Sequence, residues 1–228
     1  MPWLQGDQFD AVMNYPFTEA VIDFVAKRKI GAEKFANEVI SHLELYPDNV
    51  KQVLFNLLGS HDTARILTEC QDDKGRLKLA FLLLLTHPGS PSIYYGDEIG
   101  LTGDGDDFAF YRKCMEWEAD KQDQDLLSFM KQLIKTRKTY SAFTDNARFG
   151  LLEANNDSGL LVFTRGHGAQ QMIVALNNGE ASVQVNLSDA YSNSTIRDAW
   201  NEGNEVLGQE ALSFTLEPKQ FRIYSVES

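Results

Sequence analysis

The stretch NLLGSHDTARI, residues 56–66, decides how the first half of this chain is read. An apolar run, VLFNLL at 53–58, ends there in Ser60, His61 and Asp62. A run that is apolar throughout is typical of a parallel strand buried on both faces. Polar groups just beyond such a strand lie where α/β barrels place their functional residues. The pattern therefore predicts a parallel α/β fold with a polar site after this strand.

Strand-like and helix-like segments alternate on both sides of this stretch. Further strands are predicted at FDAVM (9–13) and SIYY (92–95). Apolar residues at helical spacing predict helices over 17–26, 32–45, 75–86 and 124–139. This alternation is expected of a parallel sheet with crossover helices.

The sequence changes character near residue 148, where the helical period ends. Seven short strand-like runs follow: FGLLEA, GLLVFTR, QMIVALN, SVQVNL, STIRDAW, LSFTL and QFRIYSV. Runs of this length separated by Gly, Asn, Asp or Ser are typical of an antiparallel sandwich or barrel. We therefore expect two domains, 1–147 of the α/β class and 148–228 of the all-β class.

Composition excludes several classes of partner. The formal net charge of −12 repels phosphate backbones and anionic lipids, which argues against nucleic-acid and membrane partners. The longest apolar run, 79–85, is far shorter than the ~20 residues of a membrane span. Cys70 and Cys114 lack metal-ligand spacing, which favours two free thiols in a reducing compartment over a disulfide. We expect a cytoplasmic protein.

The polar residues after the predicted strands have structural as well as functional interpretations. Asp97 and Glu98 follow SIYY, so two neighbouring strands deliver carboxylates to one edge of the sheet. Acidic residues after a strand often only orient a loop, and this structural interpretation is favoured for these two acids. The segment Ser60–Thr63 could cap the next helix, and Arg65 could form an ion pair on a helix face.

The aromatic residues also have two interpretations, sugar stacking or core packing. They are Trp3, Phe9, Tyr15 and Phe17 near the start. For Tyr94 and Tyr95 in the third predicted strand, the structural interpretation is core packing with a solvent-exposed hydroxyl.

Three separated stretches resemble the alpha-amylase family of glycoside hydrolases. They are LLGSHDTARI (57–66), GSPSIYYGDEIGLTGDGD (89–106) and RKCMEWE (112–118). They look most like the neopullulanase, cyclomaltodextrinase and maltogenic amylase branch. MPWLQGDQFDAVMNYPF (1–17) is similar to the segment leading into the sixth barrel strand of that branch. The resemblance implies the C-terminal part of a TIM (β/α)8 barrel, about strands 6–8, followed by an antiparallel β-sandwich.

The resemblance also implies roles for individual residues. Asp62 corresponds to the third catalytic carboxylate, which holds sugar hydroxyls more tightly as the ring flattens in the transition state. His61 would donate to a neighbouring hydroxyl, and Arg112 would reach the glucose one site further from the cut. Asp97 and Glu98, together with Arg65 beside them, would support the site from behind.

Two departures from the family pattern stand out. The branch usually has an aspartate four residues before the arginine, where this chain has Phe108, and Asp107 is the residue that could replace it. The nucleophile and the acid/base of the family come from strands that precede the matched segments. We therefore expect the C-terminal part of a larger enzyme, with neither of those two groups in this chain.

The sequence thus predicts part of a retaining hydrolase that acts on α-1,4 or α-1,6 glucosidic bonds. The alternative is a non-catalytic carbohydrate-binding or assembly module, with Trp200 and Tyr191 as candidate sugar contacts. The expected partners are an α-glucan or cyclodextrin, the missing N-terminal half of the barrel, and a second copy paired through open sheet edges. We expect no cofactor and no metal; calcium occurs in the wider family, but no ligand pattern for it is visible.

Overall fold

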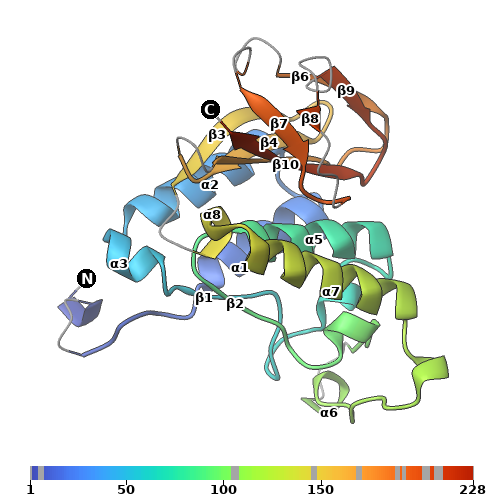
Figure 1. The fold of residues 1–228 in the computed structure, drawn as a ribbon. Coiled ribbons are helices and arrows are strands. Elements are labelled where there is room, and N and C mark those ends of the chain that lie inside the picture. The colour runs from blue at the N-terminus through green and yellow to red at the C-terminus, as the bar shows by residue number, and fades with distance from the viewer. Residues whose placement is uncertain are drawn as a thin grey trace.

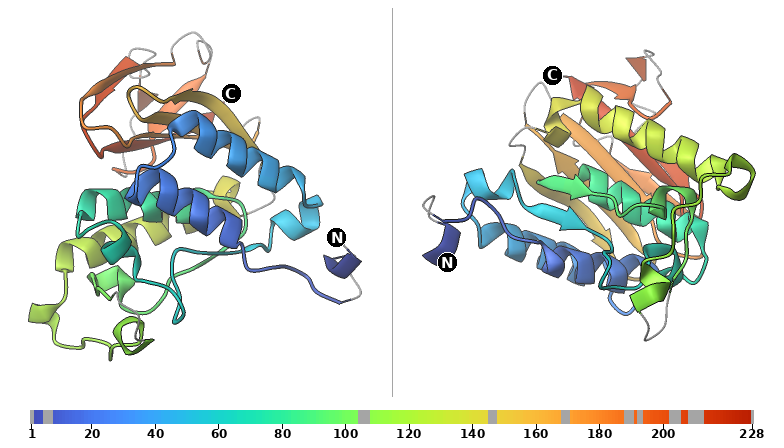
Figure 2. Two further views of the ribbon diagram at one scale, coloured as in Figure 1. Left: turned by 180° about the vertical axis from the view of Figure 1, so that it is seen from behind. Right: turned by 90° about the horizontal axis from the view of Figure 1, so that it is seen from below.

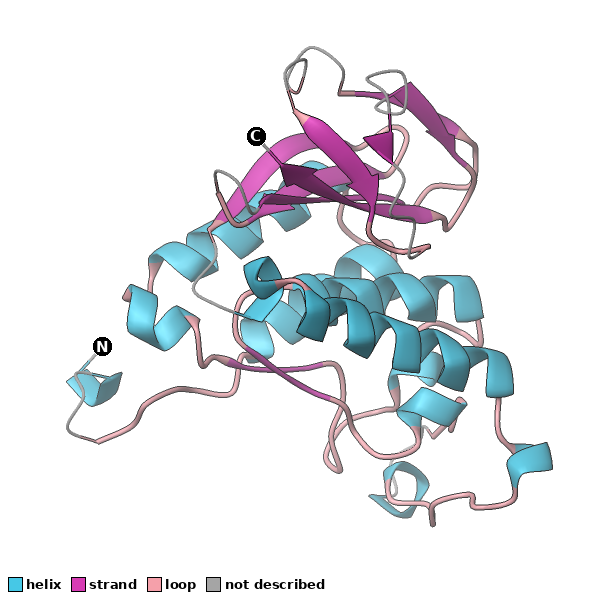
Figure 3. Cartoon of the chain, viewed as in Figure 1, coloured by secondary structure: helices cyan, strands magenta, loops and turns pink. Residues whose placement is uncertain are grey.

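The computed structural model describes residues 2–4, 8–103, 108–144, 148–167, 171–187, 191, 194–201, 206–207 and 213–227. A helical layer that contains a short parallel sheet packs beneath a layer of antiparallel strands (Figure 1). Figure 3 shows helices and strands separated between these two layers. The change of class predicted near residue 148 is therefore confirmed.

Helices account for most of the first part of the chain. The α-helices are α1 (Tyr15–Val21), α2 (Ala32–Glu44), α3 (Asp48–Lys51), α4 (Ile66–Glu69), α5 (Lys74–Thr86), α6 (Phe108–Tyr111), α7 (Gln124–Thr139) and α8 (Ser141–Thr144). A π-helical segment, η2 (Ile22–Ala26), continues α1, and 3-10 turns lie at η1 (Pro2–Leu4), η3 (Asp97–Ile99) and η4 (Ala119–Lys121). Asp73 and Asp123 cap α5 and α7, because their carboxylates accept the free backbone N–H groups of Arg76 and Leu126. All four predicted helices are confirmed.

Three extended segments run parallel in chain order. Strand β1 (Phe55–Leu57) pairs in parallel with β2 (Ser90–Ser92), and Met13 makes a parallel bridge to Phe55. One buried amide joins all three segments. Asn56 Oδ1 accepts a hydrogen bond from Asn14 Nδ2 at 2.8 Å, and Asn56 Nδ2 donates to the Pro88 carbonyl, also at 2.8 Å. These bonds fix the relative register of the segments.

Two predicted strands are shorter than the sequence indicated. In FDAVM only Met13 makes a β-bridge. SIYY belongs to β2 at Ser92 alone. The two tyrosines that follow leave the sheet because their rings pack against the buried guanidinium of Arg65.

The second part of the chain is antiparallel. Its strands are β3 (Phe149–Asn155), β4 (Leu160–Arg165), β5 (Gln171–Asn177), β6 (Val183–Asn186), β7 (Thr195–Asp198), β8 (Val206–Leu207), β9 (Ser213–Leu216) and β10 (Phe221–Glu227). They form one sheet in the order β3-β4-β5-β10-β7-β8 and a second sheet of β6 and β9. All seven predicted strands are present, and β8 was not predicted. The antiparallel arrangement of this part is thereby confirmed.

The central strands β4 and β5 of the larger sheet are buried on both faces. Leu161, Phe163 and Val174 belong to the same apolar cluster as α2, α5 and α7, whereas Leu160 and Val162 face the cluster shared with β6 and β9. Figure 2 shows the helices lying along this sheet from behind and from below. The helical part and the antiparallel part therefore share one hydrophobic core where they meet.

The two cysteines agree with the thiol interpretation. Cys70 is buried, Cys114 is exposed, and both are free. In the part of the chain that the structure describes, no helix combines the length and apolar character that a membrane crossing requires.

Candidate functional site

The candidate site lies on two loops that leave neighbouring parallel strands. One loop follows β1 and carries His61 and Asp62, and the other follows β2 and carries Asp97. The loops lie close together, since a Cβ atom built on Gly59 would be 3.7 Å from Asp97 Oδ2. The sequence-based expectation that two strands deliver carboxylates to one edge of the sheet is thus met.

Asp62 stands between a histidine and an arginine. Its Oδ2 lies 3.3 Å from His61 Nε2, and its Oδ1 accepts from Arg112 Nη2 at 3.1 Å. Arg112 Nε also donates to the His61 carbonyl at 3.0 Å. All three side chains are about half exposed, at 60% for His61, 55% for Asp62 and 47% for Arg112. A polar ligand can therefore reach the Asp62 carboxylate as an acceptor, and the His61 imidazole and the Arg112 guanidinium as donors, at one place.

The alternative that this segment caps a helix is wrong. The N-cap position of α4 is Arg65, and it makes no side-chain capping bond. Ser60 and Thr63 instead bond within the turn: Ser60 N donates to Thr63 Oγ1 at 2.9 Å, and Asp62 N donates to Ser60 Oγ at 3.1 Å. The turn leaves the Asp62 carboxylate free to face Arg112.

Beneath the exposed group lies a buried ion pair. Arg65 Nη1 is 2.9 Å from Asp97 Oδ1, and the side chains are 0% and 2% exposed. Burial raises the pKa of Asp97 to about 7, although the hydrogen bond and the charge of Arg65 oppose that shift. Arg65 is therefore a core residue that connects the two loops, and the interpretation as a helix-face ion pair is wrong.

Of the remaining predicted site residues, Glu98 acts on Asp97, and Asp107 cannot be placed. Glu98 is half-buried in η3, and its charge adds to the rise in the pKa of Asp97. Asp107 lies outside the described residues. Among the described residues, no group of three or more His, Cys, Asp or Glu side chains is arranged to hold a metal ion.

The aromatic candidates divide into packed and exposed residues. Phe17 is buried and stacks on His87 with 4.2 Å between ring centroids. Trp200 lies against Phe129 and Phe221, with ring centroids 5.4 and 4.9 Å away, and Tyr191 is buried among the antiparallel strands. Tyr191 is therefore a packing residue, and Trp200 is partly buried with its ring packed on two phenylalanines, which weakens both as candidate sugar contacts. Trp3, Phe9 and Tyr15 are exposed.

Sequence reasoning missed the contacts that hold the Arg112 segment. The hydroxyl of Tyr95 donates to the Lys113 carbonyl at 2.7 Å, and the hydroxyl of Tyr94 donates to the Tyr111 carbonyl at 3.3 Å. A hydroxyl bound to a distant backbone carbonyl leaves no pattern in sequence, since any residue supplies the acceptor. The tyrosine pair itself was the only available signal.

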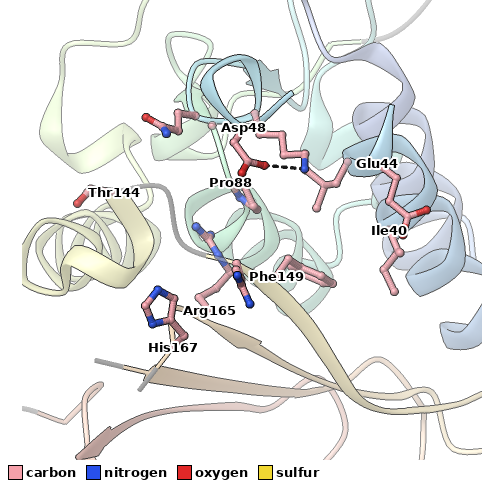
Figure 4. Close-up of a pocket in the computed structure, with 13 residues that line it drawn as sticks. Ile40, Glu44, Asp48, Pro88, Thr144, Phe149, Arg165 and His167 are labelled. Carbon is pink, nitrogen blue, oxygen red and sulfur yellow. Dashed lines mark hydrogen bonds and ion pairs between the residues drawn. The ribbon is translucent and has the colours of Figure 1, made fainter. Parts of the chain in front are cut away.

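A separate cavity of about 420 Å³ lies at the opposite edge of the parallel sheet (Figure 4). Its walls include Gln52 and Gly89, which precede β1 and β2, and it contains none of the predicted site residues. Lys51 and Asp48 in its wall pair with each other at 2.9 Å. Functional groups gather at the carboxyl ends of parallel strands, so this cavity is not the candidate site.

Comparison with known proteins agrees with this geometry. Residues 1–149 match the family model of the alpha-amylase catalytic domain, and residues 149–223 match that of the maltogenic amylase C-terminal domain. A cyclomaltodextrinase from Geobacillus thermopakistaniensis is 40% identical over 228 residues, which is 100% of this chain and 38% of that protein. An intracellular maltogenic amylase from Bacillus subtilis is 41% identical over 205 residues, 88% of this chain and 34% of that protein.

A solved cyclomaltodextrinase structure superimposes with a TM-score of 0.84 at 38% identity, covering 99% of this chain and 38% of that one. The chain thus spans 34–38% of the length of these relatives. The family resemblance seen in the sequence is confirmed: the chain belongs to the alpha-amylase family and carries a maltogenic amylase C-terminal domain.

Proposed function

We propose that this chain supplies the sugar-binding side of the active site in a retaining α-glucan hydrolase. The observation that carries the proposal is the exposed Asp62 carboxylate held between His61 and Arg112 at 3.3 and 3.1 Å. It stands after β1, at the edge of the parallel sheet where barrel enzymes keep their functional loops. The substrate class is an α-glucan with α-1,4 or α-1,6 bonds, including cyclodextrin.

Each polar group has a part in this mechanism. Retaining glycosidases pass through an oxocarbenium-like state, and hydrogen bonds to ring hydroxyls strengthen as that state forms. Asp62 would accept from hydroxyls of the glucose beside the scissile bond, and His61 would donate to one of them. Arg112 would bind the next glucose. Bonds that are stronger in the transition state than in the bound substrate accelerate the reaction.

The chain by itself would be catalytically incomplete. A retaining glycosidase needs two further carboxyl groups, a nucleophile and an acid/base, ~5–5.5 Å apart across the bond. Asp97, the carboxylate behind Asp62, is buried against Arg65 and cannot reach a sugar. We propose that Met13, β1 and β2 belong to about strands 6–8 of a (β/α)8 barrel. The other strands would supply the two missing groups.

The domain division and the location belong to the same proposal. Residues 1–147 would be the barrel part and 148–228 the sandwich. The protein would work in the cytoplasm, as the word intracellular in the name of the B. subtilis relative suggests.

A non-catalytic sugar-binding module is the competing function. Burial of Tyr191 and packing of Trp200 on Phe129 and Phe221 weaken it, because they leave less ring surface for stacking on a sugar.

The test compares the chain with its Asp62→Asn variant, alone and after fusion to the preceding barrel segments of a cyclomaltodextrinase. We expect no hydrolysis of maltoheptaose or β-cyclodextrin by the chain alone. We expect hydrolysis by the fusion, and a loss of at least about a hundredfold in kcat with Asp62→Asn. Activity of the fusion that is indifferent to Asp62→Asn would overturn the role of Asp62, and turnover by the chain alone would overturn its incompleteness.

A further inference from the structure

Arg112 lies on a short backbone segment that is held on both of its sides. The carbonyl before it, of Tyr111, accepts from the Tyr94 hydroxyl at 3.3 Å. The carbonyl after it, of Lys113, accepts from the Tyr95 hydroxyl at 2.7 Å. Two neighbouring tyrosines in the loop after β2 therefore fix the backbone that carries the arginine.

The tyrosines are themselves held by Arg65. Its guanidinium carbon lies 4.4 Å from the ring centroid of Tyr94 and 4.7 Å from that of Tyr95. Its Nη1 donates to the Tyr95 carbonyl and to Asp97. Nε and Nη2 of Arg65 are buried and have no hydrogen-bond acceptor among the described residues. The electron-rich faces of the two tyrosine rings therefore stabilise this side of the guanidinium. A fully buried cation of this kind keeps both rings in one orientation.

The exposed ion pair above this group contributes little order by itself. Arg112 and Asp62 are about half exposed, and exposed ion pairs between long side chains contribute little because water screens them and side-chain entropy opposes them. Arg112 Nε also donates to the His61 carbonyl at 3.0 Å, and both this bond and the 3.1 Å contact with Asp62 need the backbone to present Arg112 at this place.

We propose that Arg65, Tyr94 and Tyr95 are positioning residues that hold Arg112 against Asp62, so that a sugar meets both groups already in place. The connection runs from Arg65 to Tyr95, on to the Lys113 carbonyl, and so to the backbone of Arg112. Its value for catalysis rests on the proposed function, but the positioning is a property of this chain alone. Groups that are fixed before binding lose less entropy when the ligand arrives.

The direct test uses Tyr95→Phe, which keeps the ring over Arg65 and removes only the hydroxyl. A nitroxide attached to the exposed thiol of Cys114, next to Lys113, reports the motion of the segment, and buried Cys70 stays unlabelled. We expect a clearly more mobile spectrum in Tyr95→Phe and an unchanged spectrum in Tyr15→Phe. Tyr15 is a matched control because its exposure is 37%, against 38% for Tyr95. Equal mobility in all three proteins would overturn the proposal.

A second readout separates positioning from a general effect on folding. The dissociation constant for maltoheptaose is measured by calorimetry, in the fusion described above, for Tyr95→Phe, Arg112→Ala and the double variant. We expect Tyr95→Phe to weaken binding several-fold in the wild-type background and to have no effect when Arg112 is absent. Equal effects in both backgrounds would overturn positioning through Arg112. Absence of any sugar binding would refute the proposed function, and the nitroxide spectra would still decide the positioning.

Discussion

Arg65 Nη1 and Asp97 Oδ1 lie 2.9 Å apart in the core of the protein, although 32 residues separate them in sequence. They come from the loops after two neighbouring parallel strands, so this ion pair joins the two loops from which the candidate site is built. Loss of one partner of a buried pair leaves an uncompensated charge, which is costly. The pair thus couples the stability of the fold to the geometry of the site.

Asp97 gives the stability of the protein a specific pH dependence. Burial raises its pKa to about 7, whereas a carboxyl in the unfolded chain has a pKa of about 3.9. Between these values the folded state holds a proton that the unfolded chain has released. The stabilisation that the protonated Asp97 carboxyl gives to the folded state is therefore complete below about pH 4. It is lost as the pH rises to about 7.

We expect the free energy of unfolding of the wild type to fall relative to that of Asp97→Asn between pH 5 and pH 8, measured by urea titration. A difference between wild type and variant that stays constant over this range would show instead that Arg65 keeps the carboxylate charged throughout.

Arg76 connects the helical layer to the larger sheet. Its Nη1 donates to the Val25 carbonyl at 3.1 Å and to Asn178 Oδ1 at 3.3 Å, and its side chain also pairs with Glu180. We expect Arg76→Met to lower the free energy of unfolding by about 2–4 kcal/mol, because buried acceptors lose their donor. Arg28→Met is the matched control. Arg28 pairs with the same Glu180 but is 47% exposed, so we expect a loss below about 1 kcal/mol. Equal losses in urea unfolding would contradict this account.

Asn56 holds the three parallel segments in register through its buried amide. Asn56→Asp keeps the shape but cannot donate to the Pro88 carbonyl when ionised. We expect a loss of about 3 kcal/mol at pH 7 that is partly recovered near pH 4, where the protonated acid can donate again. Thermal unfolding at both pH values measures the effect. Asn37→Asp, on the exposed face of α2, should change stability by less than about 0.5 kcal/mol.

The two thiols should react very differently. Burial raises the pKa of Cys70 to about 12, whereas Cys114 is exposed. Because the thiolate is the reactive form, we expect Ellman's reagent to modify only Cys114 in the native protein. Cys70 should react after unfolding in urea. Rapid reaction of both thiols in the native state would mean that the α4–α5 region opens readily.

An exposed apolar surface along the parallel sheet predicts self-association. Met13 is 47% exposed, Val53 41% and Phe55 42%. Exposed apolar side chains that lie together on a protein surface favour association, so we expect sedimentation velocity to show dimers or larger species at high concentration. Phe55→Glu should shift the protein toward monomer. Leu152→Glu, at a residue of similar exposure on β3, should not. A clean monomer at all concentrations would refute this expectation.

The elements that local sequence controls were predicted well. The apolar stripe of α7 and its capping Asp123 lie within the helix or directly beside it, and the predicted bounds agree with the structure. The strand predicted at SIYY was wrong because distant contacts outweigh the local preference there. Its residues favour a strand locally, but Tyr94 and Tyr95 gain more by packing on Arg65, a partner 29 and 30 residues away.

The sequence by itself determined the order of the elements, the change of class near residue 148, the family, and the position of His61 and Asp62 at the end of a parallel strand. These depend on patterns within a few residues, where propensity and spacing act directly. Only the tertiary structure decided that Arg112, 50 residues from Asp62, is its ion-pair partner, and that Arg65 is buried beneath them. Such choices depend on which loops the sheet brings together, because charge and burial act through space between groups that no local pattern connects.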